Sequence, residues 1–302
     1  MYCVLTANGS YRFMNGWAST LFKKAYFVSQ LYLVAEPKPS YQLFPLGDSA
    51  ITIDLGNCID EQLNRQALAL YDWLEAHRFP GVLDIIVAYS SVSVFYDPLV
   101  VRASGITGFD PVAEWVEKWL ARAWREAEIG QAPQPDERAY GPVGGSKRSD
   151  GEHAFGPETG SGPVLSIPVC YEGEYAPDLD WVAREKGLTG EEVVSIHSIG
   201  VYRVYMVGFL PGFSYMGIVD ERIQLARKPQ PVPVVAGGVG IAGMQTGIYP
   251  LNSPGGWQII GRTPMRLFDT GEDPPVRLKT GDRVRFCPIS ASEFRRLSGR
   301  PG

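Results

Sequence analysis

The segment between Gly208 and Pro264 constrains the fold of this chain more than any other. It holds eleven glycines and seven prolines among 57 residues, which excludes long helices because both residue types disrupt the helical backbone. The same segment is rich in valine, isoleucine, phenylalanine, tyrosine and tryptophan, whereas disordered Gly/Pro tracts lack such residues. The sequence therefore predicts a folded region of short strands and sharp turns, of the kind found in a β-barrel.

The sequence around this segment predicts the rest of a barrel domain spanning residues 164–290. Strands are expected at 164–170 and 201–207, and a Gly-Asp turn precedes a last strand that ends near Phe286. A short helix at 178–186 is expected to stop at Gly187. Thr189 and Glu192 have the spacing of a capping box, which predicts a second helix running to about Ser198.

Residues 41–128 predict a separate, small α+β domain. Apolar residues recur with helical period over 59–77 and again over 111–128. β-branched and aromatic residues indicate short strands at 42–46, 50–55, 82–89 and 92–96. The resulting order, ββαββα, favours a sheet with its helices on one face, so the predicted fold class of the whole chain is α+β.

Three further ranges are expected to lie outside these two domains. Residues 1–40 have neither sustained periodicity nor a signal-peptide pattern, and we interpret them as an appended leader, with a membrane-targeting segment as the alternative. Residues 129–163 consist largely of Gly, Pro, Ser and charged residues, which is typical of a flexible linker. Residues 291–302 are expected to form a C-terminal tail.

Charge and composition exclude several classes of function. The net charge of −5 leaves no basic field for a nucleic-acid partner, and no apolar run is long enough to span a membrane. The four cysteines are scattered without a C-x-x-C pair, which disfavours zinc and redox motifs and suits reduced thiols in a cytoplasmic protein. With only three histidines in distant places, no metal site is predicted.

Gly238, Gly240 and Gly243 match the G-x-G-x-x-G pattern of dinucleotide-binding proteins. That pattern requires a helix that opens within the motif, and Gly247 and Pro250 prevent a long helix here. We therefore reject a dinucleotide site. A backbone nest that binds an anion through N–H groups remains an alternative at 237–243.

The few polar residues in the Gly/Pro-rich region, together with its aromatic rings, predict a pocket lining. The residues in question are His197, Tyr202, Tyr215, Gln245, Thr246, Tyr249, Asn252, Ser253, Trp257, Gln258 and Arg262. Structural roles compete with this interpretation: barrel core for the aromatic rings, turn hydrogen bonds for Gln245 and Thr246, and a surface cation for Arg262. For His197, the competing structural role is a position in the core or at a helix cap.

Four stretches of the chain resemble the B subunits of bacterial 5-oxoprolinases, the PxpB/KipI type also labelled allophanate hydrolase subunit 1. They are Ile196-His-Ser198 with Tyr202, Gly208-Phe-Leu-Pro-Gly-Phe-Ser-Tyr215, Gly240-Ile-Ala-Gly-Met-Gln-Thr-Gly-Ile-Tyr-Pro250 and Ser253-Pro-Gly-Gly-Trp-Gln-Ile-Ile-Gly-Arg-Thr-Pro264. Gly47-Asp-Ser49 fits the opening of the family. The resemblance implies a cyclophilin-like β-barrel in the C-terminal domain, preceded by a small α/β sandwich.

The resemblance also implies an activity. The protein would be one component of a cytoplasmic complex that opens the lactam of 5-oxoproline to give glutamate, with ATP and Mg²⁺ as co-substrate and no tightly bound cofactor. Its partners would be a C-type component, related to allophanate hydrolase subunit 2, and an A-type component of the LamB/YcsF type, without which it would be inactive. Two alternatives are an inhibitor of a sensor histidine kinase and the carboxyltransferase half of a urea carboxylase.

The same resemblance suggests site residues. His197 is expected to transfer a proton, and Arg262 to pair with a carboxylate or phosphate. The expected substrate or ATP contacts are Tyr202, Phe209, Pro211, Phe213, Tyr215, Gly240, Gly243, Gln245, Thr246, Tyr249, Gly255, Gly256 and Trp257. The chain departs from the family pattern over 227–238, where an arginine is missing, so we expect an anion contact to be lost or moved to Arg227 or Lys228.

Overall fold

The computed structural model describes residues 2–5, 11–14, 41–127 and 163–299. Strands β1 (Tyr2–Leu5) and β2 (Tyr11–Met14) pair in antiparallel fashion and belong to a unit of their own. They lie inside the range interpreted as a leader. The linker predicted at 129–163 lies outside the described residues apart from its last one.

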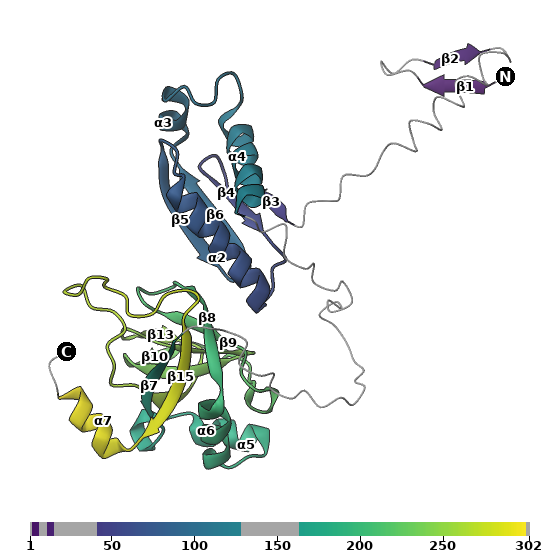
Figure 1. The fold of residues 1–302 in the computed structure, drawn as a ribbon. Helices are drawn as coiled ribbons and strands as arrows, with labels where there is room; N and C mark the ends of the chain where they lie inside the picture. Colours follow the sequence, from purple (N-terminus) through teal and green to yellow (C-terminus); the bar gives the residue numbers. More distant parts are fainter. Residues whose placement is uncertain (1, 6–10, 15–40, 128–162, 300–302) are drawn as a thin grey trace. The chain divides into compact units, whose positions relative to one another are not determined.

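The N-terminal domain is the expected sheet with helices on one face. Strands β3 (Gln42–Pro45), β4 (Ala50–Asp54), β5 (Val82–Ala88) and β6 (Ser91–Tyr96) form an antiparallel sheet in the order β3-β4-β6-β5. Helices α2 (Glu61–Ala76) and α4 (Val112–Glu126) cover one face of it (Figure 1). A short helix that the sequence analysis missed, α3 (Pro98–Ala103), begins after Asp97, whose carboxylate accepts from two backbone N–H groups.

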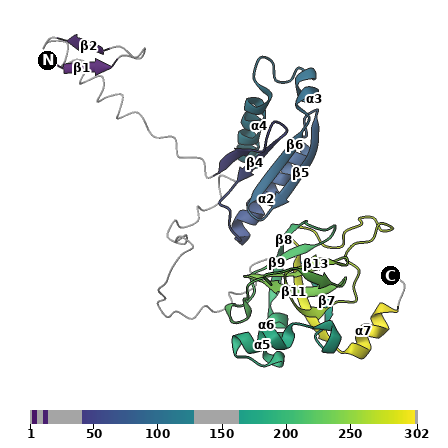
Figure 2. The same cartoon turned by 180° about the vertical axis from the view of Figure 1, so that it is seen from behind.

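The C-terminal domain is a closed barrel, which confirms the predicted fold class. Its strands follow the order β11-β12-β9-β8-β15-β7-β14. Their bounds are β7 (Val164–Cys170), β8 (Val201–Val207), β9 (Ser214–Gly217), β11 (Gly238–Ala242), β12 (Gln245–Ile248), β14 (Gln258–Arg262) and β15 (Arg283–Ile289). Outside the barrel, β10 (Val232–Val234) pairs with β13 (Ser253–Gly255). Figure 2 shows the same barrel from behind.

The Gly/Pro-rich sequence is needed for the turns between these strands. Gly237, just before β11, has φ of +85°, and a Cβ there would overlap the carbonyl oxygen of Thr263. Only glycine satisfies both conditions. The barrel is therefore closed by turns that a less glycine-rich sequence could not make.

Helices flank the barrel where capping signals predicted them. Helix α5 (Leu179–Lys186) ends at Gly187 with φ of +65°, and α6 (Gly190–Ile199) opens with the Thr189–Glu192 capping box. The range expected as a C-terminal tail contains helix α7 (Ala291–Ser298), because Ser290 caps it and its Phe294 packs on Tyr175 at 4.2 Å between ring centroids. Throughout the described ranges, every helix is too short or too polar to span a lipid bilayer.

His197, at the end of α6, is completely buried in the barrel. Its ring stacks on Phe286 at 4.5 Å between centroids. Its Nδ1 lies 2.8 Å from the Tyr171 hydroxyl, and its Nε2 lies 2.8 Å from Oγ1 of Thr246. The Thr246 hydroxyl also donates to the carbonyl oxygen of Gly240 at 3.1 Å.

One arrangement of protons satisfies every bond in this network. Because Thr246 donates to Gly240, its oxygen accepts from Nε2–H of His197, and Nδ1 then accepts from the Tyr171 hydroxyl. Burial lowers the pKa of His197 to about 3, so the ring is neutral at physiological pH. A neutral ring bonded at both nitrogens holds α6 against β12 and against Tyr171, the residue that follows β7.

This burial predicts a specific loss of stability in mild acid. An unfolded histidine has a pKa near 6.5, so below that pH the unfolded state binds a proton that the folded state does not. The stabilisation is complete above pH 6.5 and is lost as the pH falls towards 3. We expect the free energy of unfolding to fall by about 2 kcal/mol between pH 7.5 and pH 5, as measured by urea denaturation.

Two substitutions test the assignment of this effect. His197→Gln is expected to lower stability at pH 7.5 but to remove most of the decline towards pH 5. His77→Gln, at the exposed end of α2, is expected to leave the decline unchanged. An equal decline in His197→Gln would show that another group is responsible.

Candidate functional site

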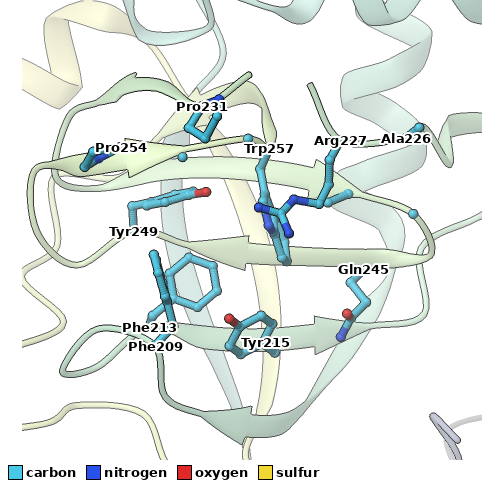
Figure 3. A pocket seen from close by; sticks show the side chains of 14 residues that line it. Phe209, Phe213, Tyr215, Ala226, Arg227, Pro231, Gln245, Tyr249, Pro254 and Trp257 are labelled. Atoms are coloured by element: carbon cyan, nitrogen blue, oxygen red, sulfur yellow. The ribbon is translucent and has the colours of Figure 1, made fainter. Parts of the chain in front are cut away.

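A cavity of about 680 Å³ opens on the barrel between β9, β12 and the segment that precedes β10 (Figure 3). The structure brings together nine of the residues expected to bind substrate or ATP: Phe209, Phe213, Tyr215, Gly243, Gln245, Tyr249, Gly255, Gly256 and Trp257. It adds Ala226, Pro231, Ala242 and Pro254, which were not assigned to the site, and Arg227, which was named with Lys228 as a candidate for the displaced anion contact. We refer to this cavity as the aromatic pocket.

Phe213 organises the aromatic wall of the pocket. Its ring meets Tyr249 and Trp257 edge to face, with centroids 4.9 and 5.4 Å apart, and lies 4.6 Å from Tyr215. Phe213, Tyr249 and Trp257 are buried, and edge-to-face contacts of this kind fix the rings relative to one another. The wall is therefore formed before any ligand binds.

Two glycines behind the wall determine where Trp257 lies. A Cβ on Gly247 would approach the Trp257 ring to 2.9 Å, and one on Gly240 would lie 3.0 Å from the Cβ of Trp257. Any larger residue would displace the indole. Gly240, which was expected to contact ligand, instead lies behind the pocket and leaves room for this side chain.

Arg227 is the one charged residue among the described residues that line the pocket. Its guanidinium lies over Gly256, where a Cβ would come within 3.3 Å of its Nε. Among the described residues it forms no hydrogen bond or ion pair. Lys228, the other candidate for the displaced anion contact, pairs with Asp178 at 2.5 Å. Of these two described candidates, Arg227 is therefore the one available to an anionic ligand.

The uncharged polar groups of the pocket are suited to hydrogen bonding. Burial raises the pKa of both Tyr215 and Tyr249, with the positive charge of Arg227 opposing it, so both hydroxyls keep their protons at neutral pH. Gln245 donates from Nε2 to the hydroxyl of Tyr89 at 3.1 Å. Tyr89 lies in the turn after β5, so that turn helps to orient the amide.

The two residues expected to be catalytic do not line the pocket. His197 lies in the barrel core with both nitrogens bonded, and Tyr202 donates to its carbonyl oxygen at 2.8 Å. Arg262 donates to the carbonyl of Ala236 at 2.8 Å, and its guanidinium lies 5.6 Å from the Phe294 ring centroid. Their catalytic roles remain predictions, and this geometry gives them no path to a ligand in the pocket.

Thr246 and Pro211 also lie off the pocket. Thr246 is buried in the His197 network, and Pro211 belongs to the exposed turn between Phe209 and Phe213. Thr246 follows Gln245 on β12, and because neighbours on a strand point to opposite faces, only Gln245 faces the pocket. Pro211 was included because it belongs to the same motif as Phe209 and Phe213.

The anion nest considered at 237–243 is not formed. Gly238–Ala242 is strand β11, which pairs with β12 on one side and β14 on the other. The N–H groups of Gly237 and Gly243 donate to the carbonyls of Tyr249 and Leu225, both at 2.7 Å. Because these N–H groups are already hydrogen-bonded to backbone carbonyls, they are not free to bind an anion, and the glycines have a structural role in the barrel. A strand also occupies the place of the helix that a dinucleotide-binding motif requires.

Within the described ranges, no cluster of three or more His, Cys, Asp or Glu side chains could hold a metal ion. The cysteines described, Cys58, Cys170 and Cys287, are all free thiols.

Phe209 and Phe213 lie in one turn but are expected to respond differently to substitution. Phe209 has φ of +71° and is 66% exposed, whereas Phe213 is 1% exposed. Glycine adopts positive φ without the steric cost that phenylalanine incurs. We expect Phe209→Gly to change the free energy of unfolding by less than about 1 kcal/mol, and Phe213→Ala to lower it by about 3–5 kcal/mol.

Thermal and urea denaturation of the two variants measure this contrast. A large loss in Phe209→Gly would mean that its ring supports the fold. A small loss in Phe213→Ala would mean that the aromatic wall can rearrange without its central ring.

The comparisons with known proteins agree with one another. The family model of the carboxyltransferase domain, subdomain C and D, matches residues 41–278. The protein named as the B subunit of 5-oxoprolinase in Bacillus subtilis (strain 168) is 40% identical over 84% of this chain and 95% of its own length. Its namesake from Haemophilus influenzae is 32% identical over 81% of this chain and 96% of its own.

A solved structure shares the fold. The crystal structure of TTHA0988 superposes with a TM-score of 0.57 at 32% identity, over 80% of this chain. This chain spans only 40% of the length of TTHA0988. With a family model matched across both domains and relatives matched over nearly their full length, the chain belongs to the family of 5-oxoprolinase B subunits, which are carboxyltransferase-domain proteins.

Proposed function

We propose that this protein is the B subunit of a 5-oxoprolinase complex, which opens the lactam of 5-oxoproline to L-glutamate while ATP is hydrolysed to ADP and phosphate. The observation that carries the proposal is the 40% identity to the Bacillus subtilis protein over 95% of its length. The aromatic pocket provides a place on this chain where a small flat substrate can bind.

The chemistry explains why ATP is needed. A five-membered lactam is an unstrained amide whose carbonyl carbon is a poor electrophile. Transfer of the γ-phosphoryl group to the amide oxygen releases ADP and activates that carbon. Water then adds to the carbon, the C–N bond breaks with the nitrogen leaving as the amine, and a second water hydrolyses the resulting acyl phosphate to glutamate and phosphate.

The pocket is suited to one part of this reaction, which is the protection of an activated intermediate from random hydrolysis. Its wall of buried rings excludes water from one side of a bound molecule. Tyr215 and Tyr249, which keep their protons, are hydrogen-bond donors for an oxygen on which charge develops.

Partner proteins are part of the proposal. TTHA0988 carries more than half of its length outside the part matched by this chain, and we propose that this chain acts together with separate C-type and A-type proteins. Exposed apolar side chains on the N-terminal domain support a binding surface for a partner, among them Leu99 at 79% and Phe109 at 107% exposure.

Reconstitution tests this function. The chain is co-purified with its C-type and A-type partners, and L-glutamate is measured after addition of 5-oxoproline and Mg-ATP. We expect glutamate and phosphate in equal amounts, and none when this chain, a partner or ATP is left out. A complete, folded complex that hydrolyses ATP without forming glutamate would contradict the proposed substrate.

A further inference from the structure

We propose that Arg227 binds the carboxylate of the lactam substrate, and that the aromatic pocket is a site for this small monoanion and not for the nucleotide. The inference rests on the proposed function and refines it, because it assigns one of the two substrates to this chain.

The first observation is that the backbone around Arg227 is fixed while its side chain is unpaired among the described residues. Before it, the carbonyl of Leu225 accepts from Gly243 at 2.7 Å, and that of Ala226 accepts from Nε2 of Gln258 at 2.9 Å. After it, Lys228 donates its N–H to Gly256 at 2.7 Å and its ammonium to Asp178 at 2.5 Å. The backbone that carries Arg227 is therefore held in place, a property that favours binding.

The second observation is where the guanidinium points. Figure 3 shows the Arg227 side chain extending from its loop into the pocket, towards Trp257 and the space between Tyr249 and Gln245. The close approach to Gly256 leaves the planar group lying on the backbone. A guanidinium directed into the pocket can bind a carboxylate through two parallel hydrogen bonds.

The remaining lining complements a flat, neutral amide ring. Tyr215 and Trp257 offer ring surfaces, with centroids 5.8 Å apart. Both Oε1 and Nε2 of Gln245 contact the Tyr89 hydroxyl, at 3.3 and 3.1 Å. The amide keeps a second N–H and a second lone pair, and a lactam presents one acceptor and one donor to meet them. A molecule with one carboxylate beside a flat cyclic amide therefore meets a partner for each of its groups.

The same lining is poorly suited to a nucleoside triphosphate. Such a ligand carries about four negative charges and is held in other proteins by several N–H donors, often at a helix N-terminus, and by carboxylates that bind Mg²⁺. Among the described lining residues there is one cation, no carboxylate and no residue of a helix. We therefore assign the nucleotide to a partner protein.

The cavity, at about 680 Å³, is larger than a single lactam ring requires. A lactam bound at Arg227 leaves the rest of the pocket open in the isolated chain, so its affinity there is expected to be low. The test therefore uses the assembled complex.

The principal variant is Arg227→Met, which removes the charge. The Arg227 side chain is exposed and has no partner among the described residues, so its loss is not expected to disturb the fold. Because a charge-assisted, bidentate contact is lost, we expect the KM for 5-oxoproline to rise about 10- to 100-fold, with the KM for ATP within twofold of wild type. Arg227→Lys keeps the charge but not the planar fork, so its KM for 5-oxoproline is expected to lie between those of wild type and Arg227→Met. The matched control is Arg222→Met, an exposed arginine paired with Asp220, which is expected to change neither constant.

A second ligand separates recognition of the carboxylate from recognition of the ring. 2-Pyrrolidinone is the same lactam without the carboxylate, and it is tested as a competitor of 5-oxoproline. Its inhibition constant is expected to be the same in wild type and Arg227→Met, because it has no group for the guanidinium to bind. An inhibition constant that rises in the variant would indicate that Arg227 acts on the shape of the pocket and would overturn the inference.

Other outcomes distinguish the inference from the proposed function. Unchanged KM for 5-oxoproline in Arg227→Met, in a complex that forms glutamate, overturns the inference and leaves the function intact. A rise confined to the KM for ATP places the nucleotide in the pocket and also overturns it.

If the wild-type complex forms no glutamate, the proposed function fails, and equilibrium dialysis with labelled 5-oxoproline decides the inference separately. Binding that is weakened at least tenfold in Arg227→Met supports it, and equal or absent binding in both proteins overturns it.

Discussion

The pocket depends on aromatic rings that lie directly against the backbone of the barrel strands. Trp257 rests on Gly240 and Gly247, and a Cβ at Gly255 would overlap the ring of Tyr249. A side chain at any of these positions would push the wall into the cavity or out of the barrel. Gly240 and Gly247 therefore act on the site from behind, and Gly255 acts within the lining itself; each determines where an aromatic ring lies.

Much of the fold could be predicted from the sequence because the signals were local. The Thr189–Glu192 capping box, the stop at Gly187 and the periodicity of α2 all act within a few residues, and each is found where it was expected. Helix α3 was missed because six residues contain too few repeats to show a period. Helix α7 was missed for the same reason, although its Ser290 cap was a readable signal.

The site was predictable in composition but not in geometry. The motif containing Phe213 and the one containing Trp257 were identified as site regions, and the structure joins them in one wall. The charged and titratable groups were harder to place: the sequence named Arg227 and Lys228 as candidates for an anion contact without choosing between them. Arg262 donates to the carbonyl of Ala236, 26 residues away, and His197 bonds to Tyr171, just after β7, and to Thr246 on β12. Such partners are distant in sequence, so only the fold shows that these two side chains are already hydrogen-bonded to other parts of the chain.

Whether a charged side chain is already paired also determines whether it can bind a ligand. In a folded domain most charged side chains near a cavity are paired, as Lys228 is with Asp178, and a paired cation gains little from a new anion because it must first give up the old one. Arg227 has no such competitor among the described residues, and its backbone is held on both sides. Binding a carboxylate there costs neither a broken ion pair nor a reordered loop. A lining with one unpaired cation, and otherwise neutral donors and rings, thus favours a ligand with one negative charge, which leaves the highly charged phosphoryl chemistry to a surface of different composition.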